Sequence, residues 1–282
     1  MTVDPRPIAM LDSGVGGLSI LREVRQQLPN EDVLYFADQG HVPYGPRPLE
    51  EIRRFVRGIT QFFMERDAKA IVIACNAASA ASLLYAREVF PEMAFVGMEP
   101  AIKPAAERTR SGVIGVITTQ ATYQGELFAS LVDRFANGIE VVTQVCPDFV
   151  TLVERGQLDG GEVRRTAERY LRPLLAAQID HLVLGCTHFP FLIPVLKAVV
   201  GPAVEIVDPS PAVARQTGRV IANQRGPRDH TGKVIYYTSG DPEVFTALAR
   251  RLVGESIAPT QVVATGWRED QLRVVSEWRL PS

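Results

Sequence analysis

The stretch AIVIACNAAS, residues 70–79, decides the expected fold because it joins an apolar strand to a helix rich in small residues. A run of apolar residues such as 70–74 is typical of a parallel strand that is covered on both faces. HLVLGCTHFP, residues 181–190, repeats the arrangement and also places a cysteine directly after the strand. The two stretches therefore predict equivalent strand–helix units in different parts of the chain.

Outward from these stretches, short apolar segments alternate with longer amphipathic ones. This alternation predicts an α/β protein with parallel sheets and right-handed crossovers. Strands are expected at residues 8–11, 33–36, 70–74, 95–97, 113–118, 139–145, 181–184, 204–207, 234–238 and 261–264. Helices are expected at residues 18–28, 49–66, 78–90, 101–109, 124–134, 162–177, 191–199, 211–223 and 242–251.

A weak internal similarity supports two related domains. IAMLDSGVGG at 8–17 is similar to VIGVITTQAT at 113–122, an offset of 105 residues. The two cysteine-containing stretches are offset by 111 residues, from 71 to 182. We expect one α/β domain from residues 1–97 together with 208–282, and a second, similar domain from residues 98–207.

The composition is that of an ordinary globular protein. The 282 residues are 46% hydrophobic and 22% charged, and 30 basic residues nearly balance 32 acidic ones. This balance argues against a nucleic-acid-binding surface. The sequence shows neither an apolar run long enough to span a membrane nor a signal peptide. Three cysteines are too few for a disulfide framework, so we expect a reducing compartment, the cytoplasm.

Cys75 and Cys186 follow their strands at the edge where ligands bind in open α/β sheets. A helix N-terminus next to a cysteine favours the thiolate. Either residue alone is more often a small buried apolar side chain than a functional one. Two equivalent cysteines, each followed by a hydrogen-bonding residue (Asn76, Thr187), indicate a function. Cys146 lacks this setting, and we interpret it as structural.

A pair of facing thiols can invert the configuration of a carbon atom. One thiolate removes a proton from carbon, and a protonated thiol on the opposite side returns one. The pKa of a free thiol, about 8.5, makes both protonation states accessible near neutral pH. Racemisation needs this arrangement, with one base on each side of a planar intermediate. The chain also has only four lysines, so it offers few candidates for a Schiff base with pyridoxal phosphate.

Asp12 and Ser13 follow the first expected strand and precede a glycine-rich stretch. Its backbone N–H groups could hold a carboxylate or a phosphate, although a structural turn explains the glycines equally well. The stretch departs from the dinucleotide-binding pattern because Ser19 stands where that pattern needs glycine. A charged residue such as Asp12 at the carboxyl end of a strand could tune proton transfer at a neighbouring cysteine.

His188 lies two residues after Cys186 and is a candidate proton partner for that thiol. A second cluster with the spacing of a zinc site is missing from the sequence, so no metal site is predicted. His41 lies near PYG, residues 43–45, in a loop that could line a pocket. Glu154 ends a short expected helix, where a lone glutamate is usually exposed to solvent.

Taken together, five motifs resemble those of glutamate racemases, in the family's order and spacing and over nearly the whole chain. They are DSGVGGLS (12–19), PYG (43–45), ACNAAS (74–79), CPDFVTLVERG (146–156) and GCTHFP (185–190). The resemblance implies two similar α/β domains with the active site in the cleft between them. It also implies a cytoplasmic, cofactor-independent homodimer that makes D-glutamate from L-glutamate for peptidoglycan synthesis.

The resemblance also implies roles for individual residues. Cys75 would exchange a proton with D-glutamate and Cys186 with L-glutamate, assisted by Asp12 and His188 respectively, with Glu154 near the second thiol. The substrate contacts would come from Asp12, Ser13, Tyr44, Gly45, Asn76, Ala77, Thr187 and His188.

The chain departs from the family pattern in two places. Ala77 replaces a residue that usually carries a hydroxyl group, so we expect activity with weaker substrate binding. Thr151 replaces a common proline and affects helix entry more than chemistry. The longer N-terminal extension of members activated by a cell-wall precursor is also missing, so we expect no such activation.

Two other kinds of protein fit parts of the sequence. Aspartate and hydantoin racemases and malonate-type decarboxylases belong to the same superfamily. A decarboxylase needs only one of the two thiols, and an aspartate racemase is expected to lack the PYG and GCTHFP motifs together. A two-lobed ligand-binding protein would use a similar cleft but would have no need for paired thiols.

Overall fold

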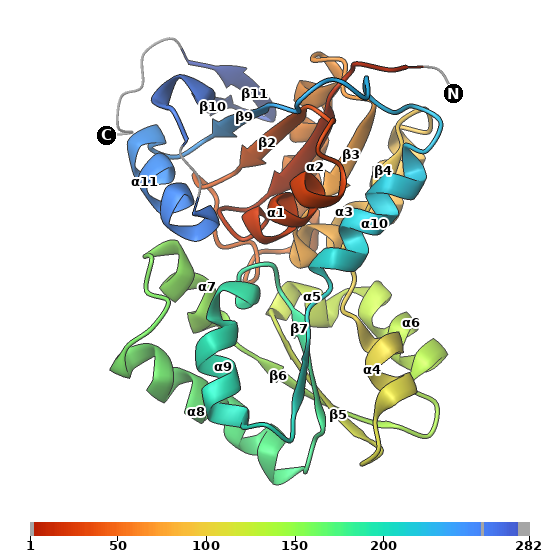
Figure 1. Cartoon of the computed structure of the whole chain (residues 1–282), viewed down its shortest axis with the longest axis vertical. Helices are drawn as coiled ribbons and strands as arrows, with labels where there is room; N and C mark the ends of the chain where they lie inside the picture. Colours follow the sequence, from red (N-terminus) through yellow and green to blue (C-terminus); the bar gives the residue numbers. More distant parts are fainter. Residues whose placement is uncertain (1–2, 255–256, 276–282) are drawn as a thin grey trace.

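A computed structural model of the chain, which describes residues 3–254 and 257–275, contains two β-sheets in two lobes (Figure 1). The larger sheet has the strand order β11-β10-β9-β2-β1-β3-β4 and the smaller sheet the order β6-β5-β7-β8. The strands of the larger sheet are β1 (Ile8–Asp12), β2 (Val33–Ala37), β3 (Ala70–Ile73), β4 (Phe95–Val96), β9 (Val234–Thr238), β10 (Val262–Arg268) and β11 (Gln271–Val274). Those of the smaller sheet are β5 (Val113–Thr118), β6 (Glu140–Val145), β7 (His181–Gly185) and β8 (Glu205–Val207).

The two sheets repeat the same core arrangement. The order β2-β1-β3-β4 in the larger sheet corresponds to β6-β5-β7-β8 in the smaller one, and all these strands pair in parallel. The predicted α/β fold with two similar parallel sheets is confirmed. One strand departs from it, because β11 is antiparallel to β10 at the edge of the larger sheet and lies outside the expected strands.

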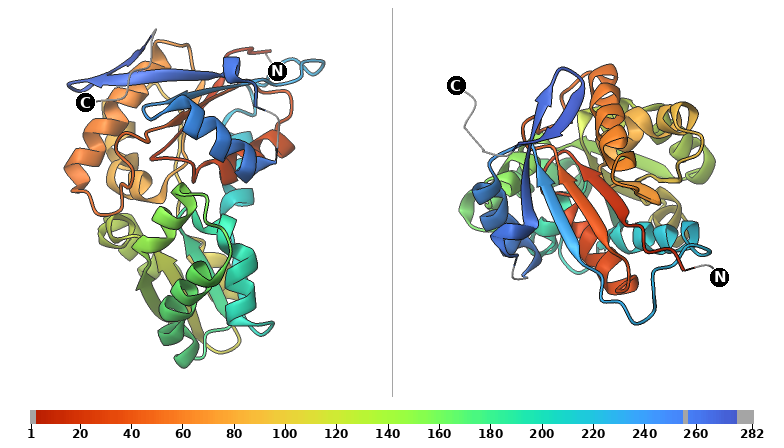
Figure 2. Two further views of the ribbon diagram at one scale, coloured as in Figure 1. Left: turned by 90° about the vertical axis from the view of Figure 1, so that its left-hand side faces the viewer. Right: turned by 90° about the horizontal axis from the view of Figure 1, so that it is seen from above.

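Helices cover both faces of the larger sheet (Figure 2). Three of them pack together on one face: α1 (Leu18–Gln27), α10 (Ser210–Val220) and α11 (Pro242–Val253). On the other face lie α2 (Leu49–Met64) and α3 (Asn76–Val89). Strand β1 is buried throughout because Ile8 and Met10 face the first group and Ala9 and Leu11 the second. This double burial explains the continuous apolar runs in the sequence.

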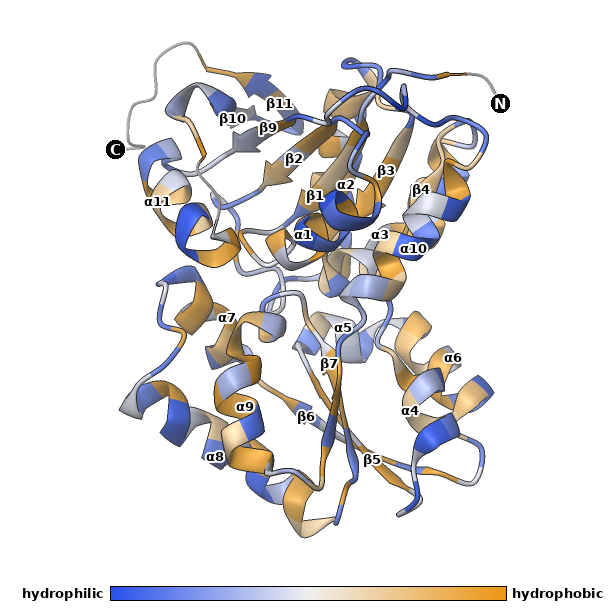
Figure 3. Cartoon of the chain, in the orientation of Figure 1, coloured by the Kyte–Doolittle hydropathy of each residue, from blue (hydrophilic) through white to orange (hydrophobic). Residues whose placement is uncertain are grey.

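The smaller sheet is covered in the same way. Helices α4 (Ile102–Arg108) and α6 (Glu126–Phe135) pack on one face. The other face carries α7 (Pro147–Glu154), α8 (Gly161–Ala176) and α9 (Ile193–Val200), and α9 is preceded by the 3-10 turn η1 (Phe189–Leu192). A short helix, α5 (Gln120–Gln124), follows β5. Figure 3 shows that apolar residues concentrate on the strands and on the helix faces toward them.

The chain passes between the lobes twice, once after β4 and once after β8. Strands β9 to β11 therefore return to the larger sheet after the whole smaller sheet has been formed. The short turn η2 (Pro259–Gln261) leads into β10. Among the described residues, no helix is both long enough and apolar enough to cross a membrane.

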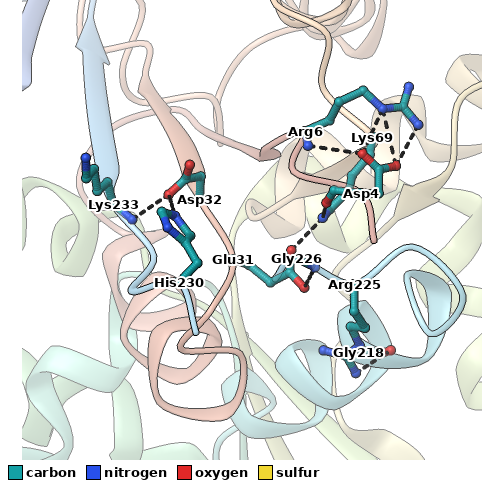
Figure 4. A network of polar contacts seen from close by, with 10 residues as sticks. All are labelled: Asp4, Arg6, Glu31, Asp32, Lys69, Gly218, Arg225, Gly226, His230 and Lys233. Atoms are coloured by element: carbon teal, nitrogen blue, oxygen red, sulfur yellow. Dashed lines mark hydrogen bonds and ion pairs between the residues drawn. The ribbon is translucent and has the colours of Figure 1, made fainter. Parts of the chain in front are cut away.

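A buried polar network joins the amino ends of the strands in the larger sheet (Figure 4). Lys69 Nζ lies 2.5 Å from Glu31 Oε2 and donates to the carbonyl oxygen of Asp4. The backbone N–H of Gly226 donates to the other oxygen of Glu31. Beside this group, His230 Nε2 lies 2.8 Å from Asp32 Oδ1. The network lies at the end of the sheet opposite Cys75, because Glu31 precedes β2 and Cys75 follows β3.

Candidate active site

The cysteines of the two similar stretches occupy equivalent places. Cys75 follows β3 and caps α3, and its Sγ accepts a hydrogen bond from the backbone N–H of Ala78 at 3.5 Å. Cys186 follows β7 directly and precedes η1. The two side chains belong to residues that are only 5% and 6% exposed. In the larger sheet the helices after β1 and β3 lie on opposite faces, so Cys75 sits at a topological switch point, the usual binding position in such sheets.

Hydrogen bonds join the loops at the carboxyl ends of the two sheets. Thr187 Oγ1, after β7, donates to Asp12 Oδ2, at the end of β1, at 3.0 Å. Ser19 Oγ donates to the carbonyl oxygen of Thr187, also at 3.0 Å. The backbone N–H of Val15 donates to Glu154 Oε1 at 2.8 Å. These contacts bring residues from both lobes into one site.

The glycine-rich stretch after β1 serves this close approach. A Cβ atom on Gly14 would lie 2.0 Å from Glu154 Oε1. A Cβ atom on Gly16 would lie 2.5 Å from both His188 Nδ1 and Thr187 Oγ1. Any larger residue at these two positions would collide with the opposite lobe. The glycines therefore allow the lobes to meet.

Cys186 belongs to a chain of three ionisable groups. His188 Nδ1 lies 3.7 Å from Cys186 Sγ, and His188 Nε2 lies 2.7 Å from Glu154 Oε1. Burial lowers the pKa of His188, but the hydrogen bonds and charges of Cys186 and Glu154 outweigh it and raise that pKa well above its usual value. Burial raises the pKa of Glu154, yet His188 and the Val15 N–H bring it below its usual value. An imidazolium–carboxylate pair therefore stands beside Cys186.

Cys75 has a different environment. Burial raises the pKa of its thiol, and the charges of Asp12 and Cys186 raise it further. Its Sγ lies 3.9 Å from Ser13 Oγ. Burial also raises the pKa of Asp12, which is partly offset by the positive charge of His188. The helix N-terminus was expected to favour a thiolate at Cys75, but burial outweighs it.

Three of the expected site residues lie deep in the same region. Asn76 is 2% exposed, and neither its amide oxygen nor its amide nitrogen has a hydrogen-bond partner within the described parts of the chain. An unpaired buried amide costs about 1–3 kcal/mol, so this group is available to a ligand. Ala77 and Thr187 are also buried.

The loop after β2 brings Tyr44 and Gly45 toward the smaller sheet. Tyr44 is buried, and its hydroxyl donates to Asp38 at 2.6 Å. The carbonyl oxygen of Gly45 accepts from the backbone N–H of Ala121 at 2.9 Å. Sequence reasoning missed Asp38, because a single aspartate after a strand is a common feature of α/β proteins.

Glu154 departs from the general expectation for its residue type, whereas Cys146 follows it. Glu154 was expected to be exposed as a lone glutamate at a helix end, but 13% of its side chain is exposed and it contacts His188. Gln39, from the larger lobe, also donates to Glu154, at 3.3 Å. Cys146 is fully buried, and its Sγ donates to the carbonyl oxygen of Gln144 at 3.5 Å.

Metal ligation is not indicated at this site. In the stretches 3–254 and 257–275, no three cysteine, histidine, aspartate or glutamate side chains are grouped so that they could hold a metal ion. All three cysteines are free thiols. The ionisable groups of the candidate site are two thiols, two carboxylates and an imidazole, and they come from two similar lobes. They belong to Cys75, Cys186, Asp12, Glu154 and His188.

By its fold and site, the chain is an α/β protein of two similar lobes. Each lobe carries a thiol after a corresponding strand, β3 or β7. The chain belongs to the Asp/Glu/Hydantoin racemase family, whose sequence pattern matches residues 16–217. The family resemblance noted in the sequence is thereby confirmed. A glutamate racemase of Pseudomonas putida is 50% identical over 240 residues, which are 85% of this chain and 91% of that protein.

Solved structures show the same fold. The glutamate racemase isoform RacE1 of Bacillus anthracis superposes with a TM-score of 0.84 at 31% identity and covers 94% of this chain and 98% of its own. The glutamate racemase of Escherichia coli, in complex with L-glutamate and the activator UDP-MurNAc-Ala, has a TM-score of 0.81 at 31% identity. That comparison covers 96% of this chain and all of the other.

Proposed function

We propose that this protein interconverts L- and D-glutamate without a cofactor, with its two buried thiols as the proton donor and acceptor. The observation that carries the proposal is the equivalent placement of Cys75 and Cys186 after β3 and β7, with the loops of the two lobes in contact. Relatives that match most of the chain are glutamate racemases, and one of them has been solved with L-glutamate.

The proposed reaction moves one proton in each half. With D-glutamate bound, the thiolate of Cys75 takes the proton from Cα and leaves a planar carbanion. The thiol of Cys186 then gives its proton to the opposite face, which yields L-glutamate and a Cys186 thiolate. The reverse reaction begins at Cys186. No electrons are gained or lost, and the proton removed is replaced by one from the second thiol.

Neighbouring groups support each half of this reaction. The imidazolium of His188, held by Glu154, would stabilise negative charge on Cys186. Asp12 would accept hydrogen bonds beside Cys75. The ammonium group of the substrate could there offset the negative charges of the Asp12 carboxylate and the Cys75 thiolate. The amide of Asn76, the hydroxyls of Ser13 and Thr187 and the backbone near Tyr44, Gly45 and Ala77 would hold the substrate carboxylates.

We place the protein in the cytoplasm, where D-glutamate serves peptidoglycan synthesis, cell-wall growth and cell shape. We also propose a homodimer that binds glutamate and no nucleic acid. Each lobe would act as a domain, residues 1–97 with 208–282 and residues 98–207. Light scattering during size-exclusion chromatography tests the dimer, and a mass of about one chain would contradict it.

The direct test follows hydrogen exchange at Cα. Purified protein is incubated with pure D-glutamate in deuterated water, and optical rotation and proton NMR are recorded. Loss of rotation with deuterium entering Cα supports the proposal. Binding of glutamate without exchange would instead indicate a ligand-binding protein, and turnover of aspartate alone would indicate a different family member.

Cysteine variants test the assignment of the thiols. Cys75→Ser and Cys186→Ser should each lower the racemisation rate by about 100- to 10,000-fold, the usual contribution of a positioned acid or base. Cys146→Ser is the matched control, because Cys146 is also buried but its Sγ donates to the carbonyl oxygen of Gln144. Equal losses in all three variants would contradict the assignment.

A further inference from the structure

Asp38, directly after β2, carries a fully buried carboxylate that the proposed reaction does not use. Its Oδ1 accepts hydrogen bonds from Ser239 Oγ at 2.6 Å and from Trp267 Nε1 at 2.8 Å. Its Oδ2 accepts from the Tyr44 hydroxyl at 2.6 Å and lies 2.9 Å from His41 Nδ1. Four side chains from three segments, the loop after β2 with His41 and Tyr44, Ser239 after β9 and Trp267 on β10, thus converge on one carboxylate.

Removing a carboxylate from water costs several kcal/mol unless hydrogen bonds or an opposite charge replace the solvent. At the other end of β2, Glu31 is buried against the cation of Lys69. Asp38 instead receives donors from hydroxyl, indole and imidazole groups. An acceptor with several directional donors fixes the orientation of the groups that donate to it.

The donor that matters for the site is Tyr44. Burial and the charge of Asp38 raise the pKa of Tyr44 well above its usual value, so its hydroxyl stays protonated and donates. Because that hydroxyl is engaged, a substrate would meet the backbone of residues 44–45 rather than the phenol. The next residue, Gly45, accepts a hydrogen bond from Ala121 of α5, and a Cβ atom on it would lie 3.1 Å from Thr119.

The other donors connect this loop to the end of the described chain. Trp267 lies on β10, and its ring lies 5.4 Å from the His41 ring and 5.7 Å from the Phe55 ring. The His41 ring in turn stacks on Phe55 at 4.0 Å. Ser239 Oγ also accepts from the backbone N–H of Gly40. The loop from residue 38 to residue 45 is therefore held at several points.

We infer that Asp38 is a positioning residue for the racemase site, and that β10 supports the site through Trp267. Asp38 fixes the Tyr44 hydroxyl and thereby places the Tyr44–Gly45 backbone against the smaller lobe, where it meets the substrate. This inference rests on the proposed function, since it assigns the loop a role in holding glutamate.

Three conservative variants test the inference. Tyr44→Phe removes one donor, Trp267→Phe removes another and keeps an aromatic ring, and Asp38→Asn places an amide N–H₂ against two donors. Each should raise the KM for glutamate, by roughly 10-fold for Tyr44→Phe and Asp38→Asn, with a smaller change in kcat. The KM of the double variant Asp38→Asn with Tyr44→Phe should rise by less than the product of the two single increases. Both substitutions act on the same hydrogen bond, so their effects should not multiply.

Glu31→Gln is the matched control, because it neutralises a buried carboxylate at the opposite end of the same strand. It should lower the Tm but change the KM less than twofold. Asp38→Asn with an unchanged KM, or losses of Asp38→Asn and Tyr44→Phe that multiply, would overturn the inference. If Asp38→Asn does not fold, the KM values of the Tyr44 and Trp267 variants decide.

A second measurement separates this inference from the proposed function. Hydrogen exchange followed by mass spectrometry should show faster exchange at residues 40–46 in Asp38→Asn and in Tyr44→Phe, but not in Glu31→Gln. A wild-type protein that fails to racemise glutamate would contradict the proposed function. Unchanged exchange in the loop would contradict the positioning role of Asp38, whatever the activity.

Discussion

The sulfur atoms of Cys75 and Cys186 occupy equivalent positions but have different electrostatic surroundings. Cys186 lies beside the imidazole of His188, whose pKa is raised because its contacts with Cys186 and Glu154 outweigh burial. The pKa of Cys75 is raised by burial and by the negative charge of Asp12. In the proposed reaction, the ammonium group of the substrate would supply positive charge beside Cys75.

Asp12→Asn should lower the pKa of the Cys75 thiol, because it removes a negative charge that disfavours the thiolate. The pH at which Cys75 becomes reactive toward iodoacetamide should shift downward. Peptide mass spectrometry measures this for Cys75 and Cys146 in the same sample. Cys146, whose thiol pKa is raised mainly by burial, should keep its reactivity profile. A shift of both cysteines, or of neither, would contradict the assignment.

Glu154→Gln should lower the pKa of His188 and weaken the contact between the lobes. The change removes a charged hydrogen-bond partner of His188 and Val15, so kcat/KM should fall by roughly 10- to 100-fold. The pKa of His188 is raised by folding, so its contribution to stability is present below about pH 6.5 and disappears as the pH rises through the folded-state pKa.

The contribution of Glu154 to stability also favours the folded state, but it depends on pH in the opposite direction. Its pKa is lowered by folding, so its contribution is present above about pH 4.3 and disappears at lower pH. The difference in unfolding free energy between the wild type and Glu154→Gln should therefore be largest between about pH 4.5 and 6.5. Urea titrations at several pH values measure it. A difference that grows steadily up to pH 9 would contradict the ion pair.

At the scale of elements, the sequence predicts the strands that carry the thiols because their burial on both faces demands continuous apolar runs. Strands β5 and β9 begin and end at the expected residues, and the ends of the others differ by one or a few residues. Expected helix 124–134 instead starts at Glu126, after a separate helix α5. Gly125, whose backbone is extended, separates the two helices, and a Cβ atom there would lie 2.7 Å from that of Ala80.

Other features depend on tertiary contacts that no local pattern reports. The strand β11 has only Leu272 buried, so its sequence lacks an apolar run, and it forms by pairing with β10. Glu154 and Asp38 are buried because distant segments supply their donors. Some of these donors lie 115 to 229 positions away, so the burial of Glu154 and Asp38 cannot be recognised from their neighbours in the sequence.

The buried pair at the amino end of β2 permits a test of stability. Glu31→Gln leaves the charge of Lys69 in the interior, so the free energy of unfolding should fall by about 3–5 kcal/mol. Replacing both residues together, Glu31→Leu with Lys69→Met, should recover much of this loss because no charge is left unpaired. Urea denaturation measures both variants. A single variant as stable as the wild type would show that the pair is not buried in solution.

At the scale of the whole molecule, the site exists only where the two lobes meet, and small residues permit that contact. Gly16→Ala would place a methyl group 2.5 Å from His188 and Thr187. We expect the lobes to stay further apart and kcat/KM for glutamate to fall by at least about 10-fold, with little change in the Tm. Small-angle X-ray scattering should report a larger radius of gyration.

Gly161→Ala is the control for this experiment. Its added methyl group would meet only the flexible end of Arg165, at the start of α8 and away from the site. Activity and radius of gyration should both remain at the wild-type values. If Gly16→Ala matched this control in both measurements, the close approach of the lobes would not be needed for activity.

The return of β9 to the larger sheet has a consequence for the newborn chain on the ribosome. In the finished sheet, strand β2 lies between β1 and β9. Residues 38–233 must nevertheless be translated before β9 is made. At about 5–20 residues per second this takes roughly 10–40 s. Throughout that interval the fully apolar β2 presents an open hydrogen-bonding edge. Nascent chains stalled before residue 234 should therefore aggregate or recruit chaperones, whereas chains released after β10 should not.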